Sequence, residues 1–246
     1  MKSIEERELA EIIFWKDSEH DRPESNSIHN IINKMGDCGV FYNVIEEYKN
    51  IFFKSKTALE LGGGQGWASC ALKRRFPNLE VTLTDISEYA ILSKHKWEKI
   101  MDVTLKQSYA CKSYKIPEED ESFDVVFCYA AAHHFSNMSE TMKEINRVLR
   151  KGGHCFFFHE PTTIQLFYKF AYNRVNKKRH VVPEDVIVRQ KLLKIGNENG
   201  FKSIIHLNPI VMNRGPVETI YYYLLSKFKI LQQILPCTAN FQFLKL

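Results

Sequence analysis

Several patterns that would assign a function directly are missing from this chain of 246 residues. The six cysteines form no CxxC pair and no Cys/His cluster at zinc-ligand spacing, so no metal site is expected. The opening residues, MKSIEERELAEIIFW, lack the apolar core and cleavage pattern of a signal peptide, which predicts a cytoplasmic chain with reduced thiols. No uninterrupted apolar run reaches the roughly 18 to 20 residues that span a bilayer, so no transmembrane segment is expected.

The composition is that of a globular domain, with 44% hydrophobic, 13% aromatic and 26% charged residues. The formal net charge is +5, but residues 161–246 hold 13 Lys or Arg against 4 Asp or Glu. Within this part, Tyr168–His180 interleaves aromatic and basic side chains, as surfaces that bind phosphate or nucleic acid do. The surplus fits an anionic partner, although a solvated surface is the commoner explanation.

From residue 57 onward, short apolar runs alternate with helix-period segments, which is typical of βαβ units. The chain is therefore predicted to be an α/β protein with a doubly wound, mostly parallel sheet and helices on both faces. The expected strands are Thr57–Leu61, Leu79–Thr84, Val103–Tyr109, Phe123–Tyr129, His154–His159 and Lys202–Leu207, with another near Pro209–Met212. The expected helices are Trp67–Arg75, Ser87–Ile100, Met138–Leu149, Thr163–Val175, Pro183–Asn199 and Val217–Leu235.

Three regions are predicted along the chain. Residues 1–50 form an N-terminal helical cap in the substrate region, and residues 51–212 form the α/β domain with an insertion at 161–182. Residues 213–246 form a C-terminal helix and a tail. The final helix is apolar around much of its circumference, so it could pack on the domain, pair with a second subunit or touch a membrane surface.

A glycine-rich loop follows the first predicted strand and precedes a helix. It spans Glu60–Gly66 and fits the pattern ExGxGxG, in which glycines let the backbone turn tightly and approach a ligand. The dinucleotide pattern GxGxxG is excluded because Trp67 stands where its third glycine would be, and no Walker Gly-Lys-Ser/Thr occurs. An acidic residue and no pyrophosphate-binding helix start suit a cofactor with an amine and a sulfonium but no phosphate.

An acidic residue also ends the second predicted strand. Asp85 lies 19 positions beyond Gly66, where a carboxylate in a doubly wound sheet can accept hydrogen bonds from both ribose hydroxyls. An isolated Asp there would more often be a helix N-cap or a turn residue. The pairing with the glycine loop favours the ligand role.

The sequence resembles the class I S-adenosylmethionine-dependent methyltransferases, especially the small-molecule, type 11/12-like members, over about Ser55–Leu207. Besides Glu60–Gly66 and Asp85, the matching stretches are Ser122–Val126, Ala132–Phe135 and Glu144–Gly153. The resemblance implies a Rossmann-like seven-stranded sheet ending in an antiparallel hairpin, with S-adenosylmethionine as cofactor and S-adenosylhomocysteine as product. The reaction it implies is methyl transfer to a small-molecule acceptor at O or N.

The resemblance also implies the cofactor site. Its predicted residues are Glu60, Gly62, Gly63, Gly64, Gly66, Asp85, Ile86, Ala110, Cys111 and Tyr129. One departure is that the family usually carries an acidic residue after the third strand to bind adenine, whereas this chain reads Tyr109-Ala110-Cys111-Lys112. A backbone group, or the side chain of Tyr109 or Cys111, would have to replace it.

Three residues at the carboxyl edge of the sheet are candidates for the catalytic base: His133, His134 and Glu160. An imidazole with a pKa near 6.5 suits the deprotonation of a phenol or hydroxyl. Tyr129 and Phe135 could add an aromatic wall at this edge, although packing is the commoner role. Two alternatives stay open: methylation of RNA or another polyanion, and a non-catalytic cofactor-binding subunit. The absence of Asn-Pro-Pro-Tyr or Asp-Pro-Pro-Tyr argues against an amino-methylating DNA enzyme.

Overall fold

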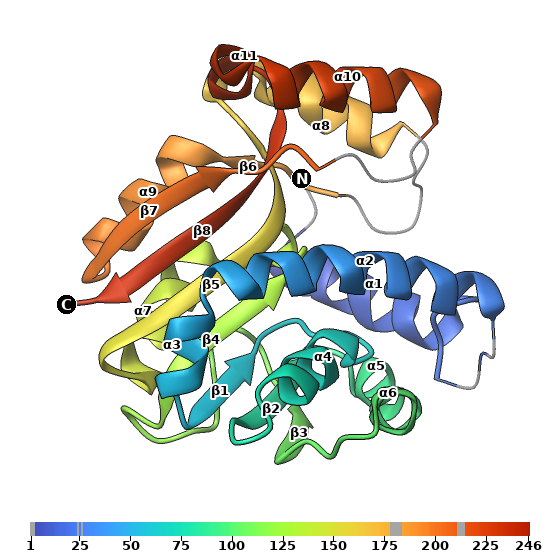
Figure 1. Cartoon of the computed structure of the whole chain (residues 1–246), viewed down its shortest axis with the longest axis vertical. Helices are drawn as coiled ribbons and strands as arrows, with labels where there is room; N and C mark the ends of the chain where they lie inside the picture. Colours follow the sequence, from blue (N-terminus) through green and yellow to red (C-terminus); the bar gives the residue numbers. More distant parts are fainter. Residues whose placement is uncertain (1–2, 24, 26, 178–183, 211–214) are drawn as a thin grey trace.

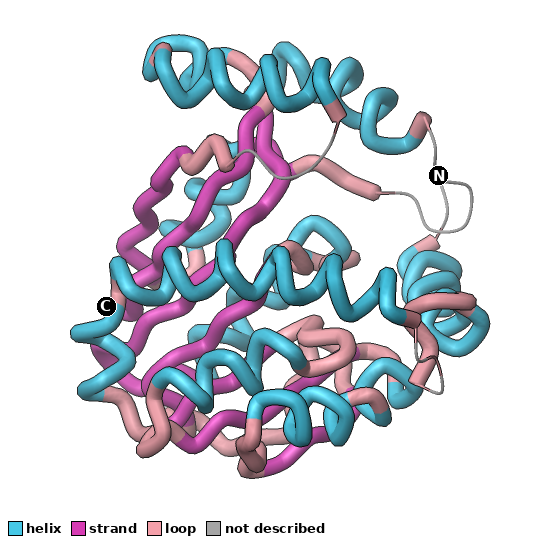
Figure 2. The backbone as a smooth tube through the Cα atoms, turned by 45° about the vertical axis from the view of Figure 1, so that its right-hand side comes forward, coloured by secondary structure: helices cyan, strands magenta, loops and turns pink. Residues whose placement is uncertain are grey.

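The computed structural model describes residues 3–23, 25, 27–177, 184–210 and 215–246. A twisted sheet runs through the middle of the molecule and carries helices on both faces (Figure 1). The tube view shows helices on the two sides of the sheet (Figure 2). Among the described residues, no helix is both long enough and apolar enough to cross a membrane.

The strands are β1 (Thr57–Glu60), β2 (Glu80–Asp85), β3 (Gln107–Ala110), β4 (Phe123–Tyr129), β5 (Leu149–Thr163), β6 (Ile187–Val188), β7 (Phe201–Leu207) and β8 (Cys237–Lys245). Their order across the sheet is β3-β2-β1-β4-β5-β8-β7, with β6 paired to the end of β5. Strands β1 to β5 are parallel, and β8 is antiparallel to both β5 and β7. The predicted doubly wound, Rossmann-like fold with a closing hairpin is confirmed.

The helices are α1 (Ile4–Asp17), α2 (Ile28–Glu47), α3 (Lys49–Lys54), α4 (Trp67–Arg75), α5 (Glu88–Leu92), α6 (Lys94–Met101), α7 (Met138–Val148), α8 (Tyr168–Asn176), α9 (Arg189–Glu198), α10 (Pro216–Lys227) and α11 (Lys229–Ile234). Two short 3₁₀ turns, η1 (Ala132–His134) and η2 (Gln165–Phe167), precede α7 and α8. The helices predicted over 67–75 and 138–149 are confirmed to within one residue.

Two hydrophobic cores pack against the sheet, one on each face. Most residues of β4 and β5 are therefore buried on both sides of the sheet. Phe41 of α2, Trp67 of α4 and Trp97 of α6 belong to the core on one face. Met142 of α7 and Leu192 of α9 belong to the core on the other. The continuous apolar sequences of these strands therefore reflect burial on both faces of the sheet.

Several predicted boundaries were wrong. The helix expected over Ser87–Ile100 divides at Ser93 into α5 and α6, and the final helix divides at Phe228 into α10 and α11. The helix expected from Pro183 begins at Arg189, after β6, and Pro183 itself lies outside the described residues. Pro209 and Ile210 form no strand, while 211–212 lie outside the described residues.

The largest correction concerns the last residues. The expected C-terminal tail forms β8, which inserts between β5 and β7 and completes the sheet. In β8, Ala239, Phe241 and Phe243 are fully buried. With β6, the sheet has eight strands where seven were expected.

Candidate active site

The glycine loop links β1 to α4 at the carboxyl edge of the sheet. Gly62, Gly64 and Gly66 have φ angles of +63°, +55° and +82°, which side chains of L-residues rarely adopt. A Cβ on Gly62 would lie 3.1 Å from the Cβ of Ala131, and a Cβ on Gly64 would lie 2.9 Å from the indole of Trp15. The loop therefore depends on glycine for both its backbone shape and its close contacts.

Glu60 fixes the loop from below rather than facing solvent. Its carboxylate is almost fully buried and accepts hydrogen bonds from the backbone N–H of Ser69, at 3.0 Å, and from the Ser69 hydroxyl. Burial raises the pKa of Glu60 to about 7, against the lowering effect of the Ser69 hydrogen bonds. Glu60 thus ties the end of β1 to the first turn of α4.

Asp85 joins the end of β2 to the same loop. Its Oδ2 accepts a hydrogen bond from Gly64 N at 2.8 Å, and its Oδ1 accepts one from Ser87 N at 2.9 Å. Burial raises the pKa of Asp85 to about 6, although these two hydrogen bonds oppose the shift. Asp85 therefore contacts the glycine loop directly, and its ribose-binding role stays a prediction.

The third strand, β3, ends beside Asp85. Cys111 N donates to the backbone oxygen of Asp85 at 2.9 Å, and burial raises the pKa of the Cys111 thiol to about 11. The Tyr109 hydroxyl donates to Glu118 at 2.7 Å, so it is already engaged. Ala110 pairs with Asp85 in the sheet register.

The three predicted base candidates lie together after β4 and near the end of β5. Glu160 is fully buried and accepts hydrogen bonds from Ala131 N and Ala132 N, each at 2.9 Å, and from His133 N at 3.2 Å. Its Oε2 also lies 2.8 Å from His133 Nδ1. Burial alone would raise the pKa of Glu160, but these partners lower it. Glu160 thus binds with both oxygens to the segment of residues 131–134, here called the histidine loop, and holds that segment in place.

Two further carboxylates that the sequence analysis missed complete this group. Glu184 Oε2 lies 2.9 Å from His133 Nε2 and 3.3 Å from His134 Nε2, and Glu11 Oε1 lies 2.8 Å from His134 Nδ1. Glu184 is 51 positions from His133 in the sequence, and no local sequence pattern predicts that the two side chains meet. Glu11 shares a face of α1 with Glu8 and Trp15, a spacing of three and four residues that could have signalled its direction.

Helix α1 packs over the glycine loop and the neighbouring loops at the carboxyl edge of the sheet. Glu8 accepts hydrogen bonds from the Tyr114 hydroxyl at 2.7 Å and the Ser136 hydroxyl at 2.9 Å, and Lys112 Nζ lies 2.7 Å from it. Hydrogen bonds from Lys112, Tyr114 and Ser136 lower the pKa of Glu8, although burial opposes them. The helix predicted as a cap therefore contacts the glycine loop, the segment after β3 and the histidine loop.

The aromatic residues at this edge mostly pack. The ring of Tyr129 stacks on His159, with centroids 5.4 Å apart, and meets Phe41 and Trp67 edge-on. Phe135 lies against Gly62 and meets Phe157 edge-on. Ala130 and His159 have φ angles of +47° and +56°, so strain of roughly 1 kcal/mol or more per residue is held at this edge.

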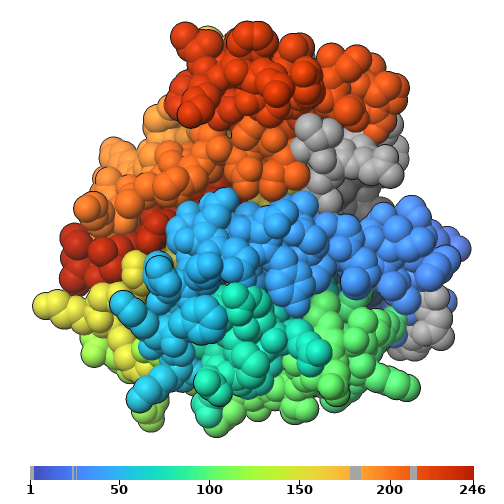
Figure 3. Space-filling view, viewed as in Figure 1, coloured from blue at the N-terminus to red at the C-terminus, as the bar shows by residue number. Residues whose placement is uncertain are grey.

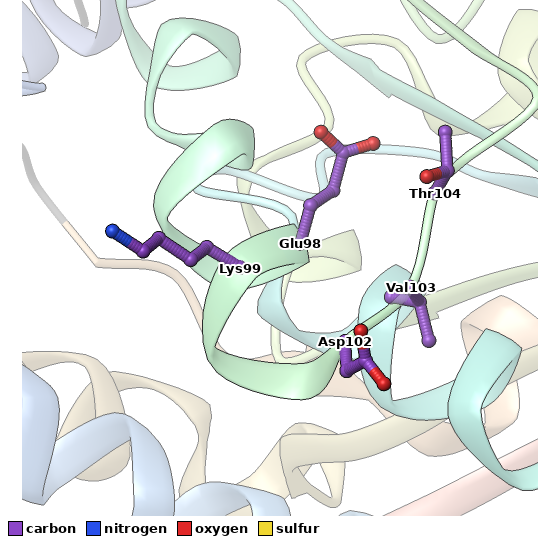
Figure 4. Close-up of a pocket in the computed structure, with 5 residues that line it drawn as sticks. All are labelled: Glu98, Lys99, Asp102, Val103 and Thr104. Carbon is purple, nitrogen blue, oxygen red and sulfur yellow. The ribbon is translucent and has the colours of Figure 1, made fainter.

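A separate surface hollow lies away from this constellation. Figure 4 shows its lining, which comes from the end of α6 and the residues that precede β3. Its residues are Glu98, Lys99, Asp102, Val103 and Thr104. None of these five residues is a predicted site residue. The hollow lies at the start of β3, whereas the glycine loop lies at the carboxyl end of β1, which runs parallel to the neighbouring strands.

Part of the chain is similar to a known protein family. Residues 59–157, which run from the glycine loop through the histidine loop to β5, match the model of a methyltransferase domain. This part of the chain is thus similar to a methyltransferase domain. The methyltransferase family uses S-adenosylmethionine, the cofactor that the sequence predicted.

The methyltransferase domain also matches curated relatives. Over 38 residues, or 15% of each chain, it is 45% identical to the uncharacterized methyltransferase YcgJ of Bacillus subtilis. Over 113 residues it is 27% identical to the phthiotriol/phenolphthiotriol dimycocerosates methyltransferase of Mycobacterium tuberculosis, which covers 43% of this chain and 41% of the relative. The chain thus spans less than half the length of these relatives.

A solved structure supports the fold over nearly the whole chain. Geranyl diphosphate C-methyltransferase from Streptomyces coelicolor, crystallised with Mg²⁺, geranyl diphosphate and S-adenosylhomocysteine, matches with a TM-score of 0.69. The match covers 98% of both chains at 10% sequence identity. At that identity the likeness shows the fold alone.

Proposed function

We propose that this chain transfers the methyl group of S-adenosylmethionine to a small-molecule acceptor, at oxygen or nitrogen, by in-line displacement. The observation that carries the proposal is the 2.8 Å contact between Asp85 Oδ2 and Gly64 N. It holds a carboxylate and a glycine cradle together at the sheet edge where doubly wound folds bind ligands.

The residues around the loop fit the cofactor. Gly62, Gly64 and Gly66 hold the loop in a conformation that needs glycine, and Gly63 N donates to Thr84 O at 2.9 Å. Asp85 would accept hydrogen bonds from the ribose hydroxyls, with Ile86 beside it. Ala110, Cys111 and Tyr129 would line the adenine side, and Glu60 would hold the loop in place for the methionine moiety.

S-adenosylmethionine supplies a methyl group that its sulfonium has already activated. The chain's task is then to hold the acceptor in line, an advantage that can reach roughly 7 to 11 kcal/mol, and to take up a proton where the acceptor has one. His133 and His134 would activate the acceptor, and Glu160 would position them. The basic C-terminal third supports an acceptor with an anionic group.

The outer layer of α8, α10 and α11 supports a second contact, with an anionic membrane surface. Val217, Ile220, Phe228 and Ile230 are each more than half exposed. The residues of this layer lie at one end of the molecule (Figure 3). The described residues of these three helices carry four Lys or Arg against one Glu. Two such basic faces would repel one another in a homodimer, whereas anionic lipids attract them.

Calorimetric titration with S-adenosylhomocysteine tests the proposed function. Micromolar binding is expected, with at least a tenfold loss in Asp85→Asn, because the amide presents only one acceptor oxygen. Acceptors are then screened by the release of S-adenosylhomocysteine. Binding without turnover across oxygen, nitrogen and polyanion acceptors would favour the non-catalytic subunit, and turnover of an RNA oligonucleotide alone would favour the polyanion acceptor. No binding by the wild type would contradict both.

A further inference from the structure

The side chains of His133, His134 and Glu184 converge on one point beside the predicted cofactor site. One nitrogen from each imidazole and one Glu184 oxygen all lie within 4.8 Å of one another. Both imidazoles direct Nε2 at the same oxygen, Glu184 Oε2, at 2.9 Å and 3.3 Å. Two residues adjacent in sequence and a third from the segment before β6 thus form a single ligand set.

The other nitrogen of each imidazole is held by its own carboxylate. Glu160 Oε2 lies 2.8 Å from His133 Nδ1, and Glu11 Oε1 lies 2.8 Å from His134 Nδ1. Carboxylates in this position fix the Nδ1–H tautomer and make Nε2 the lone-pair nitrogen, as they do for histidines that bind metals. The side chains are mostly buried, with exposed fractions of 6% for His133, 26% for His134 and 14% for Glu184.

This arrangement needs positive charge at its centre. With Nδ1–H donated to Glu160 and Glu11, each Nε2 is an acceptor, and it faces a carboxylate oxygen that is also an acceptor. Either further protons or a cation must lie between them.

We propose that His133 Nε2, His134 Nε2 and the Glu184 carboxylate bind one divalent transition-metal ion of the zinc type, with Glu160 and Glu11 as positioning residues. Imidazole ligands favour Zn²⁺, Co²⁺ or Fe²⁺ over Mg²⁺. Bonds of about 2.0 to 2.1 Å in tetrahedral geometry place ligand atoms roughly 3.3 Å apart, close to the two separations observed. Three protein ligands leave a coordination position open.

The open position gives the metal a role that rests on the proposed function. An acceptor hydroxyl or phenol bound there would have a lowered pKa and would release its proton to solvent, in place of His133 or His134 acting as the base. Its oxygen would then attack the methyl carbon as the sulfur–carbon bond breaks, with the electron pair staying on sulfur. The products are the methylated acceptor and S-adenosylhomocysteine.

Metal binding is measured on tag-free, metal-stripped full-length protein, by calorimetry with Zn²⁺ and by the visible spectrum with Co²⁺. We expect one Zn²⁺ per chain, Co²⁺ bands in the visible region, and Mg²⁺ affinity at least 100-fold weaker. His134→Ala and Glu184→Gln are expected to weaken Zn²⁺ binding at least tenfold. Glu11→Gln keeps all three ligands but removes a positioning carboxylate, so a loss of about 10-fold to 100-fold is expected.

The matched control is His95→Ala, because His95 also lies beside a carboxylate, 3.1 Å from Glu98, but on the exposed surface of α6. It should leave Zn²⁺ binding unchanged. Absence of Zn²⁺ binding tighter than about 100 µM, or equal binding by wild type and both ligand variants, would overturn the proposal. S-adenosylhomocysteine is titrated into the same samples. Cofactor binding without metal binding overturns only the metal site, whereas metal binding without cofactor binding overturns only the proposed function.

Discussion

The indole of Trp15 lies against the backbone of Gly64, so helix α1 covers the glycine loop directly. A Cβ on Gly64 would come within 2.9 to 3.0 Å of two indole carbons. Gly64, which the loop needs as a glycine, is thus also the residue that Trp15 of the N-terminal helix contacts. The cap and the cofactor site are mechanically connected at this point.

Gly64→Ala should therefore disrupt the cofactor site beyond the cost of its backbone strain. Gly152→Ala is a matched control, because Gly152 also has a positive φ, +75°, but a Cβ there would meet nothing within 4 Å. Both variants should lose about 1 kcal/mol of stability from strain. Only Gly64→Ala should weaken S-adenosylhomocysteine binding, by at least tenfold in calorimetry. Equal affinities in the two variants would show that the Trp15 contact and the loop shape do not matter for the cofactor.

Removal of the Glu8 carboxylate should release α1 from the rest of the site. Glu8 is the helix residue that contacts Lys112, Tyr114 and Ser136, which come from two separate loops. In Glu8→Ala, backbone amides of α1 should exchange with deuterium at least tenfold faster than in the wild type, while those of α7 stay protected. Glu5→Ala, an exposed change in the first turn of the same helix, serves as the control. Unchanged exchange in Glu8→Ala would mean that the other contacts of α1, such as Glu11 with His134, hold the cap without Glu8.

Part of this constellation could be predicted from the sequence, and the reason is locality. Glu60 to Gly66 lie within one strand-to-helix turn, and Asp85 ends the next strand, so their approach follows from the order of the elements. His133 and His134 are adjacent. The sequence could not predict Glu11 and Glu184, because their approach depends on how a cap helix and an insertion fold back over the sheet.

The same reasoning explains the wrong boundaries. The strand β8 contains Thr238, Asn240 and Gln242 between apolar residues, and its pairing partners β5 and β7 are both far away in sequence. Its period-two alternation was present but short, and it followed a helix that was expected to end the fold. The splits at Ser93 and Phe228 involve no Gly or Pro, so local composition did not mark them.

The stability of Glu60→Gln relative to the wild type should depend on pH. The pKa of Glu60 is about 7 in the folded protein and near its ordinary value of 4.5 when unfolded, so the folded state binds the proton more tightly. Raising the pH from about 4.5 to 7 therefore costs the folded wild type up to about 3 kcal/mol, a cost that glutamine does not share. In urea unfolding, the variant should gain stability relative to the wild type across this window and level off above it. Glu80→Gln, at an exposed position of β2, is the control. A difference that is flat or falls with pH would contradict the buried, proton-binding Glu60.

Arg189 should anchor the outer helical layer to the sheet. Its guanidinium is buried and donates to Thr162 Oγ1 at 2.8 Å and to the backbone oxygens of Gln232, Gln233 and Leu235 at 2.7 to 3.1 Å. Burial lowers the pKa of Arg189. The four acceptors bind the N–H groups of its planar guanidinium and so offset part of the free-energy cost of removing it from water.

An ammonium group cannot reproduce that fork, so Arg189→Lys should lose about 2 kcal/mol in urea unfolding. Arg174→Lys is the matched control, because Arg174 pairs with Glu218 on the surface at 3.1 Å and should lose less than about 0.5 kcal/mol. The Arg189→Lys variant should also expose α11 and the link to β8 to chymotrypsin, since two of the four acceptors of Arg189 lie in α11 and a third, Leu235, lies in that link. Equal losses in the two variants would mean that packing, rather than the guanidinium, holds α11 against the end of β5.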